Sequence, residues 1–280
     1  MQRLNFTVDA NDDGMKIVDY LKFRAGLSAS LIKRVKFGGV SVNLQTVTMR
    51  KILHTGDEID ITLPNGKSES VEPIYAPLDI VYEDDCLLIV NKPKSMPTHP
   101  SRGNTLLTLA NAVAYYLGEP SVFRSINRLD RDTSGLVLVA KDAFSAGKLG
   151  KSMKNREIDK KYLAVIQGVP EKSRDIIDAP IEREREGEIK RVVREDGKRA
   201  ITEYEVIEVL ENGNSLCSIK LHTGRTHQIR VHFAYIGHPL VNDFLYGTRE
   251  NDEDTYNLHC YEISFPHPKT NEIMRFTRMK

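Results

Sequence analysis

Long hydrophobic runs are absent from this sequence of 280 residues. The longest apolar runs, 86–90 and 136–140, are far shorter than the roughly 20 residues that cross a bilayer. The N-terminal residues contain no apolar segment of the kind that a secretory signal requires. We therefore expect a soluble, cytoplasmic protein without a membrane partner.

Cysteine is scarce, and no charge sign is in excess. Cys86, Cys217 and Cys260 are odd in number and widely separated, which argues against a disulfide framework and a CxxC metal site. The 40 Lys and Arg residues nearly balance 39 Asp and Glu, so bulk charge indicates no partner. With 40% hydrophobic residues the chain can form a core, and at roughly 150 residues per domain its length favours two domains.

A domain boundary is predicted at residues 63–77. Six of these fifteen residues are Pro, Gly or Ser, and three prolines oppose any regular element. The sequence therefore predicts a small N-terminal module at 1–64, a linker at 65–77 and a larger domain at 78–280.

The small module has a basic segment. Apolar spacing predicts two short helices, the second capped by Ser28, followed by strands. Residues 22–51 contain seven Lys or Arg and no acid, and Lys33, Arg34 and Lys36 cluster on the second helix. A solvated helix face would explain this, but so would a surface that contacts phosphates. The combination of basic helix, glycine turn and short strand resembles the RNA-binding module first known from ribosomal protein S4.

Strand-like and helix-like stretches alternate irregularly in the larger domain. This order differs from the strict βαβ alternation of a doubly wound sheet, so we expect a mixed α+β domain. A densely charged stretch, 183–199, is expected to form an exposed hairpin or loop. The strand candidates are 80–82, 87–90, 136–139, 162–166 and 201–209, and the helix candidates are 105–116 and 142–154.

Asp130 precedes an apolar strand and is flanked by Arg128 and Arg131. A turn ending at Gly135 explains Asp132 but not Asp130. A carboxylate between cations at a strand edge is a candidate nucleophile or base, and a structural cap is the alternative. The Asp-x-Asp-Thr order also resembles phosphatases that form an aspartyl phosphate, but no hydrophobic strand precedes it and no acidic pair is placed to bind Mg²⁺.

A second acid-free stretch spans residues 212–242 and contains four histidines. Thr226 is expected to cap a helix over 227–236, which would put His227 and Arg230 on one face. A helix N-terminus after Arg225 suits an anionic phosphate. Three of the histidines, His222, His227 and His232, lie five residues apart, which scatters them around a helix, so we expect no metal site.

These pieces are ordered as in the RluA-type pseudouridine synthases. The resemblance runs from about Asp79 to the C-terminus and rests on five motifs: VYEDDCLLIVNKP, NRLDRDTSGLVLVAK, KKYLAV, TGRTHQIRVH and LHCYEISFPHP. It implies a mixed, largely antiparallel catalytic sheet and the isomerisation of uridine in RNA to pseudouridine. The implied reaction consumes nothing and needs no cofactor.

The resemblance also implies roles for single residues. Asp130 would be the essential carboxylate, acting on C1′ or on the ribose 2′ proton. Tyr162, which is otherwise typical of a strand core, would pack against the uracil and is a candidate for handling the C5 proton. Arg230 would pair with the aspartate, and Arg128 would hold the flipped-out nucleotide. The family usually has His where this chain has Asn127, which puts in doubt any role for ionisation there.

The expected partner is RNA, and the N-terminal module favours large-subunit ribosomal RNA over transfer RNA by analogy alone. Arg225 and His227 would lie in the RNA-facing cleft. No obligate protein partner is predicted. The alternative is a non-catalytic RNA-binding or ribosome-assembly factor on the same scaffold, which the presence of all three implied catalytic residues disfavours.

Overall fold

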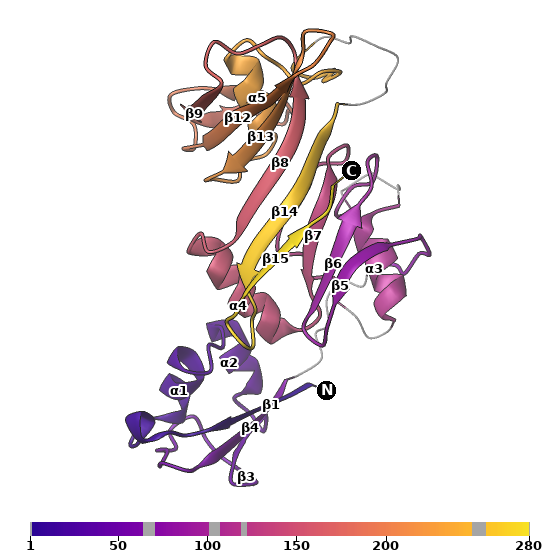
Figure 1. Ribbon diagram of the computed structural model, residues 1–280. Coiled ribbons are helices and arrows are strands. Elements are labelled where there is room, and N and C mark those ends of the chain that lie inside the picture. The colour runs from indigo at the N-terminus through magenta and orange to yellow at the C-terminus, as the bar shows by residue number, and fades with distance from the viewer. Residues whose placement is uncertain (1, 64–70, 101–106, 119–121, 248–255, 280) are drawn as a thin grey trace.

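The computed structural model describes residues 2–63, 71–100, 107–118, 122–247 and 256–279 (Figure 1). They form a small N-terminal unit and a long, twisted sheet, each with its own buried apolar cluster. Within these ranges no helix combines the length and the hydropathy needed to cross a membrane.

The N-terminal unit is a four-stranded antiparallel sheet with two helices, in the strand order β1-β4-β2-β3. Ser28 is the predicted cap of the second helix, and its hydroxyl accepts a hydrogen bond from the Leu31 N–H at 3.2 Å. Apolar residues of both helices and of β2 and β4 are buried together. The elements are β1 (Gln2–Thr7), a 3₁₀ turn (Ala10–Asp12), α1 (Ile17–Phe23), α2 (Ala29–Val35), β2 (Val40–Val42), β3 (Gln45–Thr46) and β4 (Glu58–Leu63).

The large sheet has the strand order β5-β6-β7-β14-β8-β13-β12-β9, with β15 also paired to β14. All its pairings are antiparallel except β7 with β14, which meet over only two residue pairs. The expected mixed, mostly antiparallel sheet is confirmed. Its strands are β5 (Asp79–Glu83), β6 (Leu87–Lys92), β7 (Ser134–Ala140), β8 (Asp159–Ile166), β9 (Arg174–Asp178), β12 (Ile201–Val209), β13 (Ser215–Leu221), β14 (Leu258–Pro266) and β15 (Ile273–Thr277).

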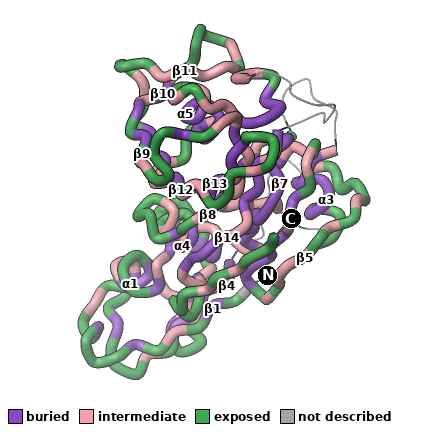
Figure 2. Tube along the Cα trace, turned by 45° about the horizontal axis from the view of Figure 1, so that its top comes forward, coloured by how far each residue is buried: buried purple, intermediate pink, exposed green. Residues whose placement is uncertain are grey.

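The densely charged stretch 183–199 forms the expected hairpin, since β10 (Ile181–Arg183) pairs with β11 (Arg191–Val193). Most of its turn is exposed to solvent (Figure 2).

Three helices accompany the large sheet, and two of them begin later than expected. α3 (Leu109–Leu117) is capped by Thr108, whereas the expected start at 105 lies outside the described residues. α5 (Gln228–Tyr235) is capped by His227 rather than Thr226, because the backbone of His227 is left-handed with φ 58°. α4 (Ala143–Lys154) begins as expected after Asp142, whose carboxylate accepts the Ser145 N–H at 2.8 Å.

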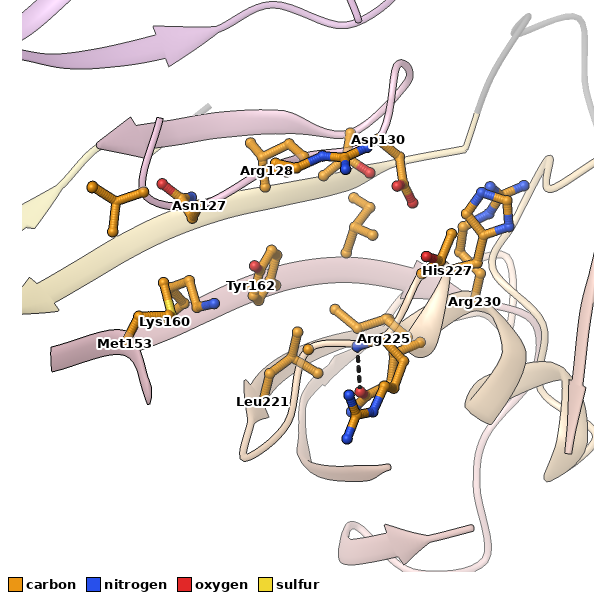
Figure 3. A pocket seen from close by; sticks show the side chains of 18 residues that line it. Asn127, Arg128, Asp130, Met153, Lys160, Tyr162, Leu221, Arg225, His227 and Arg230 are labelled. Carbon is orange, nitrogen blue, oxygen red and sulfur yellow. Dashed lines mark hydrogen bonds between the residues drawn. The ribbon is translucent and has the colours of Figure 1, made fainter. Parts of the chain in front are cut away.

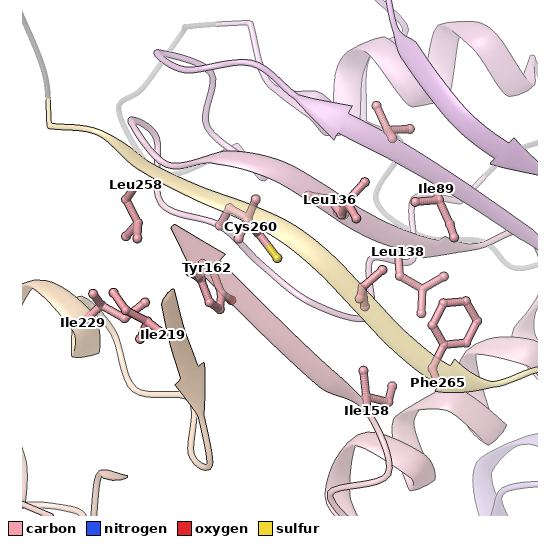
Figure 4. Packing of buried hydrophobic residues seen from close by; sticks show 14 of the residues in the cluster. Ile89, Leu136, Leu138, Ile158, Tyr162, Ile219, Ile229, Leu258, Cys260 and Phe265 are labelled. Carbon is pink, nitrogen blue, oxygen red and sulfur yellow. The ribbon is translucent and has the colours of Figure 1, made fainter. Parts of the chain in front are cut away.

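The main core lies along β7 and its neighbours, where every residue of β7 is buried (Figure 4). Side chains such as Ile89, Leu138 and Phe265 come from three different strands and are fully buried. At the junction with β14, Gly135 has φ 116°, and any Cβ there would overlap the backbone of Cys260. Glycine is therefore required where the two parallel strands meet.

The two units are in contact through α4 (Figure 1). Phe144, in its first turn, is buried in the apolar cluster of the N-terminal unit. Gly26 of that unit leaves room for the aliphatic end of Lys148, which a side chain at position 26 would overlap.

Candidate active site

A pocket of about 340 Å³ lies where the loop before β7, strand β8 and the start of α5 converge (Figure 3). It is lined by Asp130, Tyr162 and Arg230, the three residues expected to be catalytic, and by Arg128, Arg225 and His227. The structure thus brings together six residues that are up to 102 positions apart in the chain.

The Asp130 loop is held from both sides. Thr98 donates its hydroxyl to the Leu129 carbonyl at 2.7 Å and accepts the Leu129 N–H at 3.2 Å. The fully buried ammonium of Lys92 donates to the Arg131 carbonyl at 3.1 Å. Within the described ranges, the half-buried carboxylate of Asp130 itself has no hydrogen-bond or ion-pair partner. A fixed loop thus presents an unused carboxylate to the pocket.

Lys92 supplies more than one contact to this loop region. Its ammonium also donates to the carbonyls of Pro93 and Met96, both at 2.8 Å, so its three protons are all used. Burial lowers the pKa of this ammonium to about 8, while Asp132 and Asp130 act to raise it. The loop that follows β6 is therefore organised by a buried cation.

Asn127 fixes the same loop to β7. Its side-chain amide donates to the Leu136 carbonyl at 3.0 Å, and its carbonyl accepts the Leu138 N–H at 2.8 Å. An amide supplies one donor and one acceptor without changing charge. The contacts give this residue a structural role in which ionisation takes no part.

Tyr162 faces the pocket from β8 and is paired across the sheet with Cys260 (Figure 4). Burial raises the pKa of its hydroxyl well above the usual value, and Cys260 and Asp130 add to the effect. The phenol is therefore neutral near pH 7. A neutral phenol can pack against a ring or donate a proton, but it is not a base in this state.

Arg230 does not form the expected ion pair with Asp130. Its Nε and Nη2 both bind the carboxylate of Asp243, each at 2.7 Å, and both side chains are buried. Its guanidinium carbon lies 4.9 Å from the ring centre of Tyr246 and 4.4 Å from that of Tyr256. Asp130 remains close enough to contribute, after several larger causes, to the raised pKa of Arg230. Arg230 therefore acts on Asp130 through its charge, while its Nε and Nη2 groups donate their hydrogen bonds to Asp243.

A protein-family model and several known proteins match most of this chain. The family model for RNA pseudouridylate synthase matches residues 86–235. An uncharacterized RNA pseudouridine synthase of Bacillus subtilis is 38% identical over 90% of this chain and 90% of its own. The chain belongs to the RNA pseudouridine synthase family. The ribosomal large subunit pseudouridine synthase D of Pasteurella multocida is 35% identical over 85% of this chain and 78% of its own.

A solved structure agrees with this family. Human RNA pseudouridylate synthase domain containing 1 has a TM-score of 0.62 and 32% identity, covering 77% of this chain and 86% of its own. The chain is thus an RNA pseudouridine synthase, and the pocket is its candidate active site.

His227 of the synthase is held in one orientation. The Tyr246 hydroxyl accepts the Arg191 N–H at 3.0 Å and forms a hydrogen bond of 2.8 Å with His227 Nδ1. Burial lowers the pKa of this imidazole, which favours the neutral ring.

The other expected RNA contacts divide into two groups. Arg128 is exposed at the pocket wall, and Arg225 lines the pocket while its Nε donates to the Arg199 carbonyl at 3.0 Å. Lys33, Arg34 and Lys36 are exposed on α2 and do not line the pocket.

Four site residues were missed from the sequence: Asp243, Tyr246, Tyr256 and the pocket-lining Lys160. Asp243 is the first acid after the acid-free stretch, a signal that could have indicated a partner for one of its cations. Lys160 lies two residues before Tyr162 on β8, and alternate residues of a strand share a face.

One cluster has the residue types of a metal site: Asp84, Cys86 and His267. The Asp84 carboxylate already accepts the N–H groups of Cys86 and Leu87, the Tyr82 hydroxyl at 3.0 Å and a His267 ring nitrogen at 3.1 Å. These bonds show that the Asp84 carboxylate stabilises the turn before β6.

Proposed function

We propose that this enzyme converts uridine in large-subunit ribosomal RNA to pseudouridine, with Asp130 as the essential carboxylate. The observation that carries the proposal is the unpartnered Asp130 carboxylate, held on a fixed loop in the same pocket as Tyr162 and Arg230. In the reaction, the N1–C1′ bond of the uridine breaks and a C5–C1′ bond forms. The proton leaves C5 and N1 gains one, so the change is an isomerisation without a cofactor.

Each neighbour of Asp130 has a role in this proposal. The target nucleotide is flipped out of the RNA, because C1′ and C5 are inaccessible while the base is stacked. The exposed Arg128 fills the gap in the stack, and Arg225 and His227 contact the RNA. The neutral Tyr162 packs against the uracil, and Arg230 supplies a positive charge in the same pocket as Asp130.

The N-terminal unit is proposed to be an S4-type RNA-binding module. Its support is the exposed, basic face formed by Lys33, Arg34 and Lys36 on α2. Three relatives that match this chain over 84% or more of its length are named ribosomal large subunit pseudouridine synthase D, which supports ribosomal RNA and a cytoplasmic location.

The test is tritium release from RNA that carries C5-labelled uridine, with total RNA from cells lacking the gene as the substrate pool. We expect release by the wild-type enzyme and none by Asp130→Asn. Because the Asp130 side chain makes no hydrogen bond or ion pair among the described residues, the substitution should change the free energy of unfolding by no more than about 0.5 kcal/mol. Normal RNA binding by the wild-type protein and by Asp130→Ala, with no tritium released by either, would support a non-catalytic assembly factor instead.

The N-terminal module has its own test. Phe144 is buried in its core, so deleting the module would expose an apolar side chain of the catalytic domain. Replacing Lys33, Arg34 and Lys36 by Gln avoids this. The triple variant should bind RNA with a shallower salt dependence, and an unchanged slope would contradict the role of the module.

A further inference from the structure

Helix α4 connects the N-terminal unit to the active-site pocket. Phe144 in its first turn is buried in the N-terminal core, and Met153 in its last turn lines the pocket (Figures 1 and 3). A helix of 12 residues is about 18 Å long at 1.5 Å per residue. An RNA that contacts both α2 and the pocket would therefore pass along or near this helix.

The charges of α4 all have one sign. Lys148, Lys151 and Lys154 recur every three residues, Arg156 follows, and the helix contains no acid. Within the described residues none of these four cations forms an ion pair, whereas exposed cations elsewhere, such as Lys172, do. Burial lowers the pKa of the Lys148 ammonium and Lys151 lowers it further, so neighbouring positive charges on the helix repel each other.

Two glycines interrupt the interior of the same helix. Each costs roughly 1 kcal/mol of helix stability relative to alanine. A Cβ at Gly150 would have no atom within 4 Å, and one at Gly147 would touch only the Ser28 Cβ at 3.9 Å. Packing within the chain therefore requires neither glycine. Because these two glycines have no side chain, a ligand can approach the helix backbone closely there.

Positive charge continues past both ends of the helix. At the pocket end, Lys160 has no ion-pair partner among the described residues, and burial lowers the pKa of its ammonium. At the other end, burial lowers the pKa of Arg124, Asp142 acts to raise it, and Arg34 of α2 lies close enough to lower it. The cations of α2 and the pocket are thus joined by those of α4.

We propose that the exposed face of α4 binds the backbone phosphates of the RNA strand that runs from the N-terminal module to the pocket. Phosphate is the ligand that matches unpaired lysines at regular spacing, and the glycines let a backbone approach the helix closely. The proposal deepens the function above and rests on RNA being the substrate. It makes α4 a third RNA-binding element, located between α2 of the N-terminal module and the active-site pocket.

The test compares two variants with the same loss of charge. The α4 variant replaces Lys151, Lys154 and Arg156 by Gln, and all three are exposed. The control replaces Lys172, Arg174 and Arg275 by Gln, exposed cations that are each within 4.0 Å of a carboxylate. The affinity of each protein for ribosomal RNA is measured from 50 to 300 mM salt, about the range over which phosphate contacts change affinity most.

Each lost phosphate contact lowers the slope of log K against log salt by about 0.7 for a single strand. We therefore expect the α4 variant to lose about 2 units of slope and the control to keep the wild-type slope. Equal slopes in the two variants would overturn the proposal. Because phosphate contacts do not depend on RNA sequence, the result holds even if the modified uridine lies in another RNA.

A cross-linking experiment tests the same contact without removing any charge. Cys86, Cys217 and Cys260 are buried, so a photoreactive group can be attached selectively to Gly150→Cys, with Lys172→Cys as the control. We expect RNA cross-links from position 150 and not from position 172, and the reverse would refute the path. Asp130-dependent tritium release with no cross-link at 150 would leave the proposed activity intact and remove only the role of α4.

Discussion

The buried pair of Arg230 and Asp243 is expected to stabilise the fold as well as the site. Arg230→Met would remove a guanidinium that makes two 2.7 Å bonds and would leave the fully buried Asp243 carboxylate uncompensated. Breaking one side of a buried ion pair costs about 3–5 kcal/mol. In a domain of roughly 200 residues each kcal/mol moves Tm by about 2–4 °C, so we expect Tm to fall by about 6–20 °C.

The assay is a double-mutant cycle followed by thermal unfolding at pH 7.5. Asp243→Asn should destabilise as much as Arg230→Met, because it leaves the opposite charge unpaired. The double variant with Met at 230 and Leu at 243 buries no charge, so it should unfold at a higher temperature than either single variant. Tritium release should be lost in Arg230→Met and in the double variant, since neither keeps the cation near Asp130.

Arg230→Lys separates charge from geometry. Lysine keeps the positive charge but cannot form two parallel bonds or stack between Tyr246 and Tyr256. We expect intermediate stability and strongly reduced turnover. A fall in Tm of less than about 3 °C for Arg230→Met, with no coupling to Asp243→Asn, would refute this account of the pair.

Three further outcomes are expected. Gly135→Ala should cost more than about 3 kcal/mol, measured by denaturant unfolding, because its Cβ would overlap the Cys260 backbone; a cost under 1 kcal/mol would contradict the close contact. Burial lowers the pKa of Lys92 to about 8 in the folded protein, against about 10.4 in the unfolded chain. Between these two pH values the unfolded state binds more protons, so the contribution of Lys92 to the free energy of unfolding rises with pH. The Tm of wild type minus that of Lys92→Met should therefore increase from pH 8 to pH 10, and a constant difference would refute the shift. Phe144→Ala should cost about 3–5 kcal/mol and loosen the contact between the units, seen as faster proteolytic separation of the two units; an unchanged rate would mean that the contact does not hold them together.

Many strands and the cap of α2 could be predicted from the sequence because their signals are local. The alternation or continuity of apolar residues located β5, β6, β7, β8 and β12, and Ser28 was correctly predicted as a helix cap. The start of α5 could not be predicted from the same signals. His227 takes a left-handed backbone there, and its hydrogen bond to Tyr246 depends on a residue 19 positions away.

The residues that line the pocket could likewise be predicted from the sequence, but the ion-pair partner of Arg230 could not. Motif order identified Asp130, Tyr162 and Arg230, and the structure places all three at one pocket. The choice of Asp243 over Asp130 as the partner of Arg230 depends on how the turn after α5 folds back. No local pattern encodes that turn, because its contacts are made with an arginine 13 residues earlier in the chain.

The position of β14 has a consequence for how the enzyme is made. This strand begins at Leu258 of 280 residues, yet it lies between β7, which follows the Asp130 loop, and β8, which carries Tyr162. During synthesis, β7 and β8 therefore have no common neighbour until β14 has left the ribosome, and the edges that β14 will cover must wait unpaired. A nascent chain that still lacks β14 has nothing to hold the Asp130 loop and Tyr162 together, so its pocket is not yet assembled.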